Sequence, residues 1–536
     1  MEVATLIHET HFHQAKTVLT RNDRWGLLLC LGKFSARVVA LSGLRLSQRA
    51  IERRGPESQD LYGVGDREFP DMHYRLLVYG LALAGLVTVF VGTQALGQQK
   101  RPEWEEARAT QIEAARREGI PITPSDLQRP NLPADQNAAT YVAQIRILDK
   151  TAPVSPEESK ALEAINATPA PTPDQIARAK KALEAHSERV HLIHQVAQCP
   201  AYWEPPKMLD VGGIRVPDDF PRDAQFRDYA RWLVYESNVL LQEGKPLDAI
   251  QVDALGFSLA RQVGSQGSLI TLLVSEAIDA LALSGLRTIL YHEADNPAAV
   301  AAIGQAIETQ RSAPNFRPTL RGEVVRALSM SESERHMRPD KLVSEPGDTS
   351  NPPFEKTKEY RLWTRKYQYP TDPKLAMARF LDMNDAHYLA WMRRLFSLVD
   401  LPYPESLSGI QAIARESKKN ELHPDYTLAA LSIVVWPQLP AGKARHQAGA
   451  ETLRTAAALL AWKIQNGHFP ESLAECLKSV PLDPFDLRPL RYRREGDGFV
   501  LYSIGESGKF EGGQPNKRPR PGETFFRYPR PVYPNK

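Results

Sequence analysis

Two carboxylates in an apolar stretch are the strongest candidates for chemistry in this chain. Glu276 and Asp279 are three residues apart in SLITLLVSEAIDALALSGLRTILYH, so a helix places both on one face. Two buried carboxyl groups can differ in pKa and act as an acid and a base. The alternatives are that the two side chains reach the rim of the bundle, or that they form structural ion pairs with arginines such as Arg231 or Arg261. We favour the structural interpretation of this pair.

Histidine and cysteine give weaker signals. A metal site needs a third ligand beside His191 and His194, which share a helical face in SERVHLIHQ, and the sequence offers none nearby. No pair of cysteines has CxxC spacing, which excludes a thioredoxin-like motif and a cysteine-based zinc site. Cys199 and Cys476 could pair outside the cytoplasm, but two buried free thiols are the favoured interpretation. We also expect solvated side chains at the clustered histidines of the N-terminal segment, His8, His11 and His13.

Common catalytic motifs are absent from the sequence. It contains no HExxH, no GxSxG, no glycine-rich phosphate loop and no GxGxxG after a strand. Glu323 follows LRG at an expected helix start, where a carboxylate stabilises the positive end of the helix dipole. These absences favour a protein without catalytic activity, and an enzyme stays open as the alternative.

Most of the candidate side chains named above lie in segments that the sequence predicts to be helical. Apolar residues recur at helical spacing through Pro221–Thr309, and the turns EGKP and VGSQGS separate long helices. The segment that carries Glu276 and Asp279 is apolar nearly all round, which predicts the central, buried helix of the bundle. Further helices are expected at Thr172–Gln198, with Thr172 as N-cap, and at 362–369, 372–400 and 446–467. Strand signals occur only near the end, around the dipeptide Asp497-Gly498, which is typical of a tight hairpin.

An uncharged run precedes the helical region. LLVYGLALAGLVTVFVGTQALG (76–97) is long enough to cross a bilayer, and Arg75 and Lys100 bracket it. A buried helix of a soluble domain is the alternative. The flanking charges do not decide the orientation. Because MHYR at Met72 resembles the start of a signal anchor, we expect the bulk of the chain outside the cytoplasm, at a bacterial inner membrane.

The predicted fold class is mainly α, with one N-terminal transmembrane helix, an α-helical bundle or short solenoid, and a small C-terminal α+β cap. The boundaries are as follows: 1–71, an extension that is either cytoplasmic or due to a misassigned start; 75–97, the transmembrane helix; 102–135, a charged helix and proline-rich connector; 136–335, the bundle; 336–360, a mobile loop; 361–445, further helices; 446–513, a helix plus β-hairpin; and 514–536, a tail.

The tail is basic and rich in proline. Its cations are interleaved with aromatic residues such as Phe525 and Tyr528, a pattern that could bind nucleic acid. A net charge of only +3 for the whole chain gives no global support for that function. We favour an irregular tail, and expect no nucleic-acid partner.

Within Ala450–Gly513, an expected helix ends in Asn466-Gly467-His468-Phe469-Pro470, and a D-P-F segment follows at Asp483. In these motifs the segment resembles the soluble part of G-type pseudopilins of type II secretion. The resemblance implies a helix leading into a small sheet. The family's calcium-binding tail corresponds here to Gly505–Gly513, in which only Glu506 and Glu511 offer carboxylates and Lys509 lies between them, so we do not expect calcium. No prepilin-peptidase site precedes the membrane segment, so the chain is not itself a pilin subunit.

Three further features lie between Pro133 and the C-terminus. They are P-x-x-x-N-A-A-x-x-Y, which begins at Pro133 and includes Asn137, the segment EGKPLDAI, and the ending DPFDLRPLRYRREGDGFVLYSIGE. In these features the region resembles uncharacterised, membrane-anchored helical proteins of planctomycete-type bacteria. The resemblance implies an architecture and a location, and no reaction.

These observations predict a membrane-anchored, extracytoplasmic binding or scaffolding protein that contacts other envelope proteins and needs no cofactor. Two alternatives stay open. One is an envelope hydrolase that uses carboxylates in a helical cleft, and the other is an accessory protein of a type II secretion or pilus-like system.

Overall fold

The computed structural model describes the residues from 101 onward, with gaps. The described ranges are 101–127, 132–167, 170–204, 207–211, 214–218, 220–311, 315–336, 356–433, 436–510 and 523–531. The described residues from 108 onward belong to one compact unit. The predicted transmembrane helix at 75–97 and the extension 1–71 lie outside the described residues, as does most of the predicted loop.

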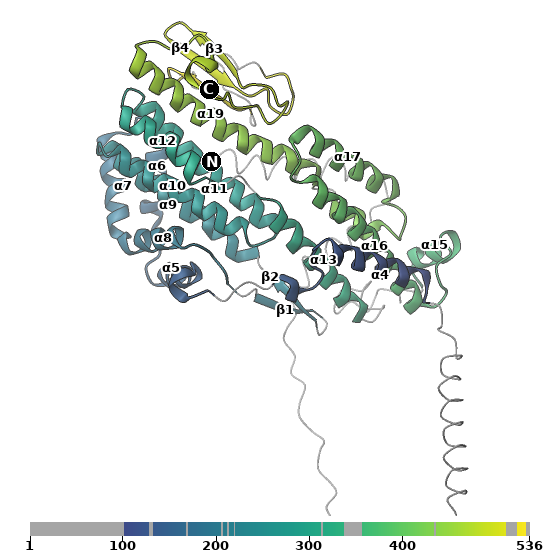
Figure 1. Ribbon diagram of the computed structural model, residues 1–536. Coiled ribbons are helices and arrows are strands. Elements are labelled where there is room, and N and C mark those ends of the chain that lie inside the picture. Colours follow the sequence, from purple (N-terminus) through teal and green to yellow (C-terminus); the bar gives the residue numbers. More distant parts are fainter. Residues whose placement is uncertain are drawn as a thin grey trace, which may run out of the picture. The chain divides into compact units, whose positions relative to one another are not determined.

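The fold is mainly α-helical, as the sequence predicts. Figure 1 shows the helices in chain order, which begin with α4 (Glu103–Arg117), α5 (Ala139–Thr151), α6 (Pro156–Ala167), α7 (Pro173–Ala185) and α8 (Ser187–Gln198). Short 3₁₀ turns, η2 (Pro124–Leu127) and η3 (Ala134–Gln136), lie between α4 and α5. Thr172 caps α7 in a reciprocal capping box with Gln175, as predicted.

The prediction of one helix across Thr172–Gln198 is wrong, because the chain breaks at His186. The backbone of His186 leaves helical geometry, with φ −112° and ψ 29°. Its buried ring lies 3.2 Å from the Glu158 carboxylate and packs edge-on against Trp232. The break therefore lets α8 turn toward the bundle, where its face of Leu192, Ile193 and Val196 is buried.

The Asn137 motif of α5 has a structural role. The Asn137 side chain accepts a hydrogen bond from the Trp203 backbone N–H at 2.9 Å and donates one to the Trp203 carbonyl at 2.7 Å. Ala138 next to it is fully buried. The asparagine thus fixes the chain after α8 against the start of α5.

Four helices form the bundle that the sequence predicts between Pro221 and Thr309. They are α9 (Phe220–Gln242), α10 (Pro246–Gly264), α11 (Leu269–His292) and α12 (Pro297–Thr309). The helix α11 contacts α9, α10, α12, α13 and α19, which confirms its central position. Among the described residues it is also the one helix whose length and apolar composition would suit a membrane span, and most of that stretch is buried in the protein.

A hairpin precedes the bundle and corrects the prediction that strands occur only near the C-terminus. Strands β1 (Lys207–Val211) and β2 (Ile214–Asp218) pair antiparallel, with Leu209 opposite Val216. The sequence KMLDVGGIRVPD contains alternating apolar residues around Gly212-Gly213, which is the signal that the sequence analysis missed.

Two close backbone approaches fix the packing of α11. A Cβ atom added to Gly285 on α11 would lie 2.2 Å from Oδ2 of Asp253, so α10 and α11 meet there only because position 285 has no side chain. At the other end, a Cβ atom on Gly322 would lie 1.6 Å from the carbonyl oxygen of Gly267, which itself has φ +85°.

The second half of the chain adds another group of helices. They are α13 (Arg317–His336), α15 (Lys358–Lys366), α16 (Pro373–Leu398), α17 (Tyr403–Asn420), α18 (Thr427–Ile433), η5 (Trp436–Gln438) and α19 (Leu439–Asn466). The predicted loop 336–360 is corrected at its ends, because α13 includes His336 and α15 starts at Lys358. Helix α19 begins seven residues before the predicted 446 and packs along α12 and α11.

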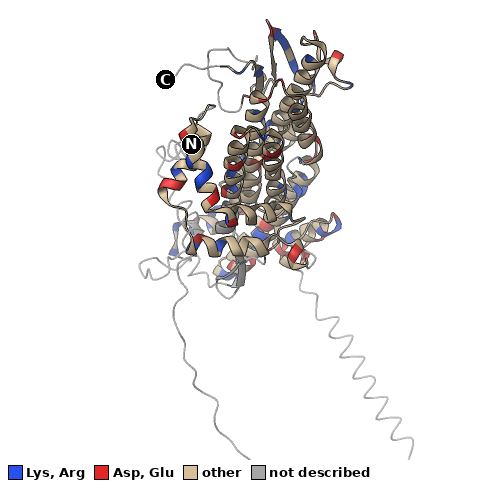
Figure 2. Cartoon of the chain, turned by 90° about the vertical axis from the view of Figure 1, so that its left-hand side faces the viewer, with Lys and Arg blue, Asp and Glu red and all other residues tan. Residues whose placement is uncertain are grey.

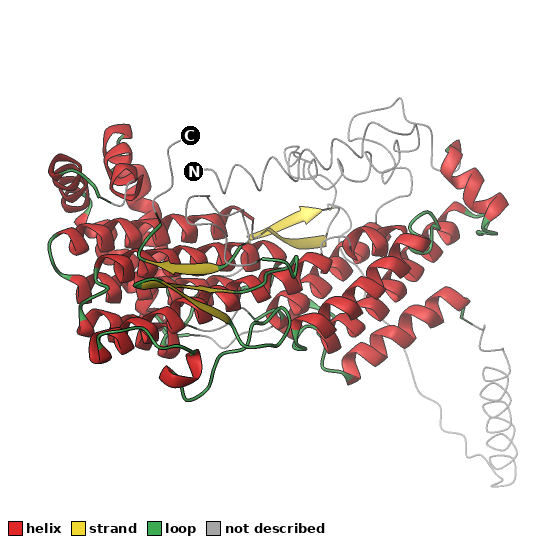
Figure 3. Cartoon of the chain, turned by 90° about the horizontal axis from the view of Figure 1, so that it is seen from above, coloured by secondary structure: helices red, strands yellow, loops and turns green. Residues whose placement is uncertain are grey.

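A small cap ends the chain. It consists of α20 (Leu473–Cys476) and the antiparallel sheet β3 (Arg491–Glu495), β4 (Gly498–Tyr502) and β5 (Phe525–Tyr528), which lies over α19 (Figures 1 and 3). The hairpin is confirmed, but the pairing of Glu495 with Gly498 makes Gly496-Asp497 the turn, not Asp497-Gly498. The prediction of an irregular tail is wrong for 525–528, because β5 completes the sheet and Phe526 is fully buried.

The buried side chains form three large clusters. One joins α10, α11, α12 and α19 to the cap, a second joins α13 to α16–α18 and a third joins α5 and α8 to α9 and α10. Lys and Arg are interspersed with Asp and Glu along the described elements (Figure 2). The helices are therefore held by apolar cores, within which a few charged groups stand out.

Candidate functional site

The predicted pair Glu276 and Asp279 lies in a buried polar group, which we call the α11–α19 cluster. Its members are Glu276 and Asp279 on α11, Arg311 after α12 and His446 on α19. Arg311 donates from Nε to Asp279 Oδ1 at 2.9 Å and from Nη2 to Oδ2 at 3.0 Å. His446 Nδ1 lies 3.3 Å from Asp279 Oδ2, and its Nε2 lies 3.8 Å from Glu276 Oε2.

The partner of the carboxylates differs from the prediction. Arg311 satisfies Asp279, whereas Arg231 bonds to Asp228, and Arg261 bonds to the Gln310 carbonyl and to Ser258. Sequence reasoning missed Arg311 and His446, because one follows the end of a helix and the other lies far along the chain. Neither position carries a local signal.

The two carboxyl groups have different environments. The Asp279 side chain is 4% exposed and the Arg311 side chain 8%, so each charge is neutralised inside the protein. Burial raises the pKa of Glu276, the nearby His446 and Arg445 lower it, and Asp279 raises it. Glu276 Oε1 makes no hydrogen bond within the described structure. Its carboxyl group lies against Gly442, where a Cβ atom would approach it to 3.2 Å.

This arrangement contains the parts of an acid–base pair. A protonated Glu276 and a neutral His446 could exchange a proton across the 3.8 Å that separates their nearest atoms, while Asp279 orients the imidazole. All four side chains are at most 16% exposed, however. The cluster therefore connects α11, α19 and the chain after α12. A substrate could react there only if it reached these buried side chains from the surface.

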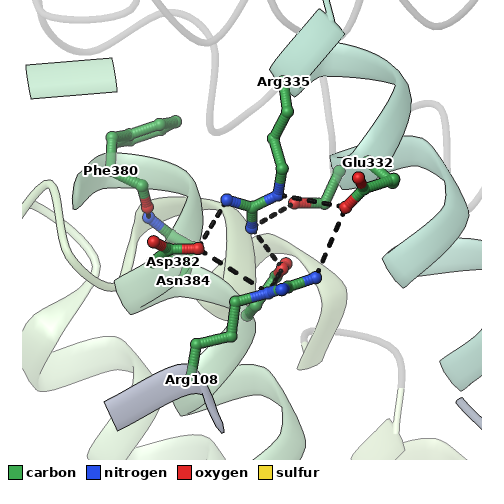
Figure 4. A network of polar contacts seen from close by, with 8 residues as sticks. Arg108, Glu332, Arg335, Phe380, Asp382 and Asn384 are labelled. Atoms are coloured by element: carbon green, nitrogen blue, oxygen red, sulfur yellow. Dashed lines mark hydrogen bonds and ion pairs between the residues drawn. The ribbon is translucent and has the colours of Figure 1, made fainter. Parts of the chain in front are cut away.

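A second polar group lies between α4, α13 and α16, and we call it the α13–α16 cluster (Figure 4). Arg108 donates from Nε to Asp385 at 2.8 Å, and its Nη2 lies 3.5 Å from Glu332. Arg335 pairs with both Asp382 and Asp385. These contacts connect α4 to two helices that lie more than two hundred residues later in the sequence.

Burial raises the pKa of two carboxyl groups around this cluster. The pKa of Glu334 is raised to about 7, chiefly by loss of water and further by the charge of Asp385, while Arg335 opposes the shift. Burial also raises the pKa of Asp382, although Arg335 and Arg108 counteract it. The sequence SESERH gives no indication that Glu334 is buried.

A charged side chain that the sequence analysis missed lies in the core of the bundle. Asp253 on α10 is 1% exposed and accepts a hydrogen bond from Ser237 at 2.9 Å, while its Oδ1 has no partner within the described structure. Burial raises the pKa of Asp253 well above the ordinary value for aspartate. Its only sequence signal is an acidic residue within the apolar stretch AIQVDALGF.

Glu323 does cap a helix, but not its own. It lies in the second turn of α13, which starts at Arg317, so the predicted position at a helix start is wrong. Its Oε1 accepts a hydrogen bond at 2.7 Å from the backbone N–H of Leu269, the first residue of α11. The carboxylate therefore joins α13 to the start of α11.

The metal and redox candidates are not brought together. Glu506 pairs with Arg445 at 2.9 Å, and Glu511 lies outside the described residues. His194 is 2.6 Å from Glu236, while His191 is exposed. The described residues include no group of three or more His, Cys, Asp or Glu that could hold a metal ion. Both described cysteines, Cys199 and Cys476, are free.

A groove runs where the bundle meets the cap. It has a volume of 540 Å³ and is lined by residues from α12, α19 and the loop after α20, namely Glu308, Gln447, Glu451, Arg454, Leu477, Lys478, Ser479, Pro481 and Leu482. Arg454 and Glu451 form an ion pair at 2.7 Å, and Leu482 is 51% exposed. The groove offers charges of both signs beside an apolar side chain.

Comparison with known proteins finds no match to this chain among family models, curated proteins or solved structures.

Proposed function

We propose that this chain is a membrane-anchored binding or scaffolding protein of the bacterial cell envelope, with its large helical part outside the cytoplasm. The groove between α12, α19 and the cap carries the proposal, because it combines a charged pair on the packed helix α19 with an exposed leucine in the loop after α20. Mixed polar and apolar lining suits a protein segment as ligand. The transmembrane helix is proposed from the uncharged run 76–97.

Location is tested by protease treatment of spheroplasts that carry the full chain with a C-terminal tag. Digestion of the tag, with an intact cytoplasmic protein as control, is the expected result. Protection of the tag would contradict the proposed orientation. Recovery of the protein in the soluble fraction instead of the membrane fraction would contradict the anchor.

Binding is tested by site-specific photocrosslinking in living cells. A photoreactive residue at Leu482 should form a discrete adduct with another protein, and Glu451→Lys should abolish the adduct because it reverses a groove charge. The matched control is Glu157→Lys on the exposed surface of α6. An adduct that persists in Glu451→Lys, or that also forms from a photoreactive residue at Ile147, would contradict binding in the groove.

A hydrolase is the second candidate, and the Glu276–His446 contact favours it. Gln447 and Glu451 of the groove follow His446 on α19, so a substrate bound there would lie near the α11–α19 cluster. The purified full chain would be assayed on ester, peptide and glycoside panels. Hydrolysis that disappears in Glu276→Gln would favour this candidate over scaffolding.

The cap also supports a role as an accessory of a type II secretion or pilus-like system. Helix α19 ends at Asn466 with Gly467 in the left-handed conformation, and Asp483 of the D-P-F segment is fully buried below the small sheet. These features agree with the proposed pseudopilin-like cap. Copurification with pseudopilins that is lost on deletion of Ala450–Gly513 would support this role.

A further inference from the structure

The helix α15 has one buried and one basic face. Tyr360 and Trp363 are each 8% exposed, and Trp363 stacks on Phe380 of α16 with ring centroids 4.7 Å apart. The opposite face carries Lys358, Arg361, Leu362 and Arg365, at the spacing of successive helical turns. The helix is therefore held to the protein by its aromatic face and presents cations to solvent.

The basic face has features of a binding surface. All four of its side chains are exposed, and Leu362 is 50% exposed. None of the three cations has an ion-pair partner among the described side chains, although most other described arginines have one. Three unpaired cations around an exposed leucine suit the interface of an anionic membrane, where phosphates meet acyl chains.

The connectivity of the chain agrees with such a ligand. Arg108, which pairs with Asp385 on α16, lies eleven residues after Gly97, the end of the proposed transmembrane helix. The helix α15 packs on Phe380 of the same helix α16.

We propose that the face of α15 formed by Lys358, Arg361, Leu362 and Arg365 docks on the anionic phospholipid surface of the membrane. Leu362 enters the interface and the three cations contact lipid phosphates. This inference rests on the proposed membrane anchor. It adds a second membrane contact, which would fix the orientation of the helical part relative to the bilayer.

The test uses the full chain reconstituted into vesicles, with Cys30, Cys199 and Cys476 replaced and one new cysteine carrying a fluorophore. With Leu362→Cys, a nitroxide-labelled lipid should quench the fluorophore in vesicles that contain phosphatidylglycerol. Quenching should be weaker in vesicles of phosphatidylcholine alone and at high salt. A fluorophore at Leu482→Cys, in the cap, should not be quenched in either vesicle.

Charge variants complete the test. Because each Lys or Arg near an anionic surface strengthens binding by roughly fivefold, Lys358→Glu/Arg361→Glu/Arg365→Glu should reduce the quenching to the level of the cap control. Lys150→Glu/Lys160→Glu/Lys181→Glu, which reverses three exposed cations on α5, α6 and α7, should leave it unchanged.

Flotation separates the two proposals. Protein that floats with the vesicles but shows no quenching at position 362, or equal quenching with and without phosphatidylglycerol, overturns docking by α15 and leaves the anchor intact. Protein that floats with neither vesicle overturns both.

Discussion

At the scale of single residues, three carboxyl groups of the described structure differ in the groups that donate hydrogen bonds to them. Asp279 accepts hydrogen bonds from an arginine, and Glu323 accepts one from the backbone N–H at the start of α11. Asp253 accepts one from a serine hydroxyl. Burial raises the pKa of Asp253, which has no cation beside it, well above the ordinary value for aspartate.

Glu334 should make the protein less stable as the pH rises. Its pKa is about 7 in the folded protein against an ordinary value of 4.5, so the folded state binds more protons between these values. Stability is then lost as the pH rises through this window, by roughly 3 kcal/mol when complete. Glu334→Gln should therefore raise the Tm at about pH 8 and change it little at about pH 4.

The matched control for this prediction is Glu157→Gln, at an exposed position of α6. An equal Tm increase in both variants, or an increase that does not depend on pH, would show that the charge of Glu334 is not the cause.

Gly285→Ala should destabilise the bundle by about 2 kcal/mol, because the new Cβ atom would overlap the buried carboxyl group of Asp253. Asp253→Ala should lower the free energy of unfolding less in the Gly285→Ala protein than in the wild type, since it removes the overlap. Chemical unfolding of the four proteins measures the coupling. Gly304→Ala, where a Cβ atom meets nothing within 4 Å, should instead be neutral or slightly stabilising. Simple additivity of the two substitutions would contradict the overlap.

At the scale of elements, the cap depends on one aspartate. Asp483 accepts hydrogen bonds from the backbone N–H of Phe485 at 3.0 Å and of Ile504 at 2.8 Å, from the Ser503 hydroxyl at 2.9 Å and from Arg491 at 3.0 Å. It thus joins the loop after α20 to β3 and to the end of β4. This explains structurally why a D-P-F segment leads into the sheet.

Asp483→Ala should unfold the cap locally, at a cost of about 3–5 kcal/mol, because it leaves buried donors without an acceptor. Hydrogen exchange in 483–504 should accelerate while exchange in α10 and α11 stays unchanged. Asp486→Ala, which removes a half-buried partner of the same Arg491, should have a much smaller effect. Equal acceleration in both variants would contradict the central role of Asp483.

Sequence periodicity predicted the elements whose pattern is local. The helices α9, α10 and α11 and the hairpin β3–β4 follow from apolar spacing and turn residues. The break at His186 could not be predicted in this way, because its cause is packing against Trp232 on another helix. The strand β5 was obscured by the proline and arginine residues around it, although Phe525 and Phe526 are typical of a strand.

At the scale of the whole molecule, the polar clusters join parts of the chain that are far apart in sequence. The common helical face of Glu276 and Asp279 was predicted from their spacing, and the burial of the helix that carries them from its apolar composition. The partners of this pair, Arg311 and His446, could not be predicted, since their proximity arises only when α12 and α19 pack on α11. The α13–α16 cluster was missed for the same reason.

The link between α4 and the rest of the protein should depend on arginine. Arg108 bonds to Asp385, and Arg393 on α16 bonds to Glu118 and to Gln111. Arg108→Ala/Arg393→Ala should release residues 108–117 from α16 and lower the free energy of unfolding by about 2–4 kcal/mol. The loss should not be larger, because Arg335 still pairs with Asp382 and Asp385. Hydrogen exchange should rise in 108–117 and not in α10. Arg178→Ala/Arg394→Ala, at exposed ion pairs, is the control, and equal exchange in both variants would contradict the link.

The contact of Gly322 with Gly267 has a consequence for tracing the ancestry of this chain. Two main chains touch there, so no exchange of neighbouring side chains can compensate for a new substituent at position 322. Distant descendants of the same ancestor should therefore keep this pair of glycines after the rest of the sequence has diverged. The pair, read together with the carboxylate at 323, would then serve as a marker by which such descendants are recognised.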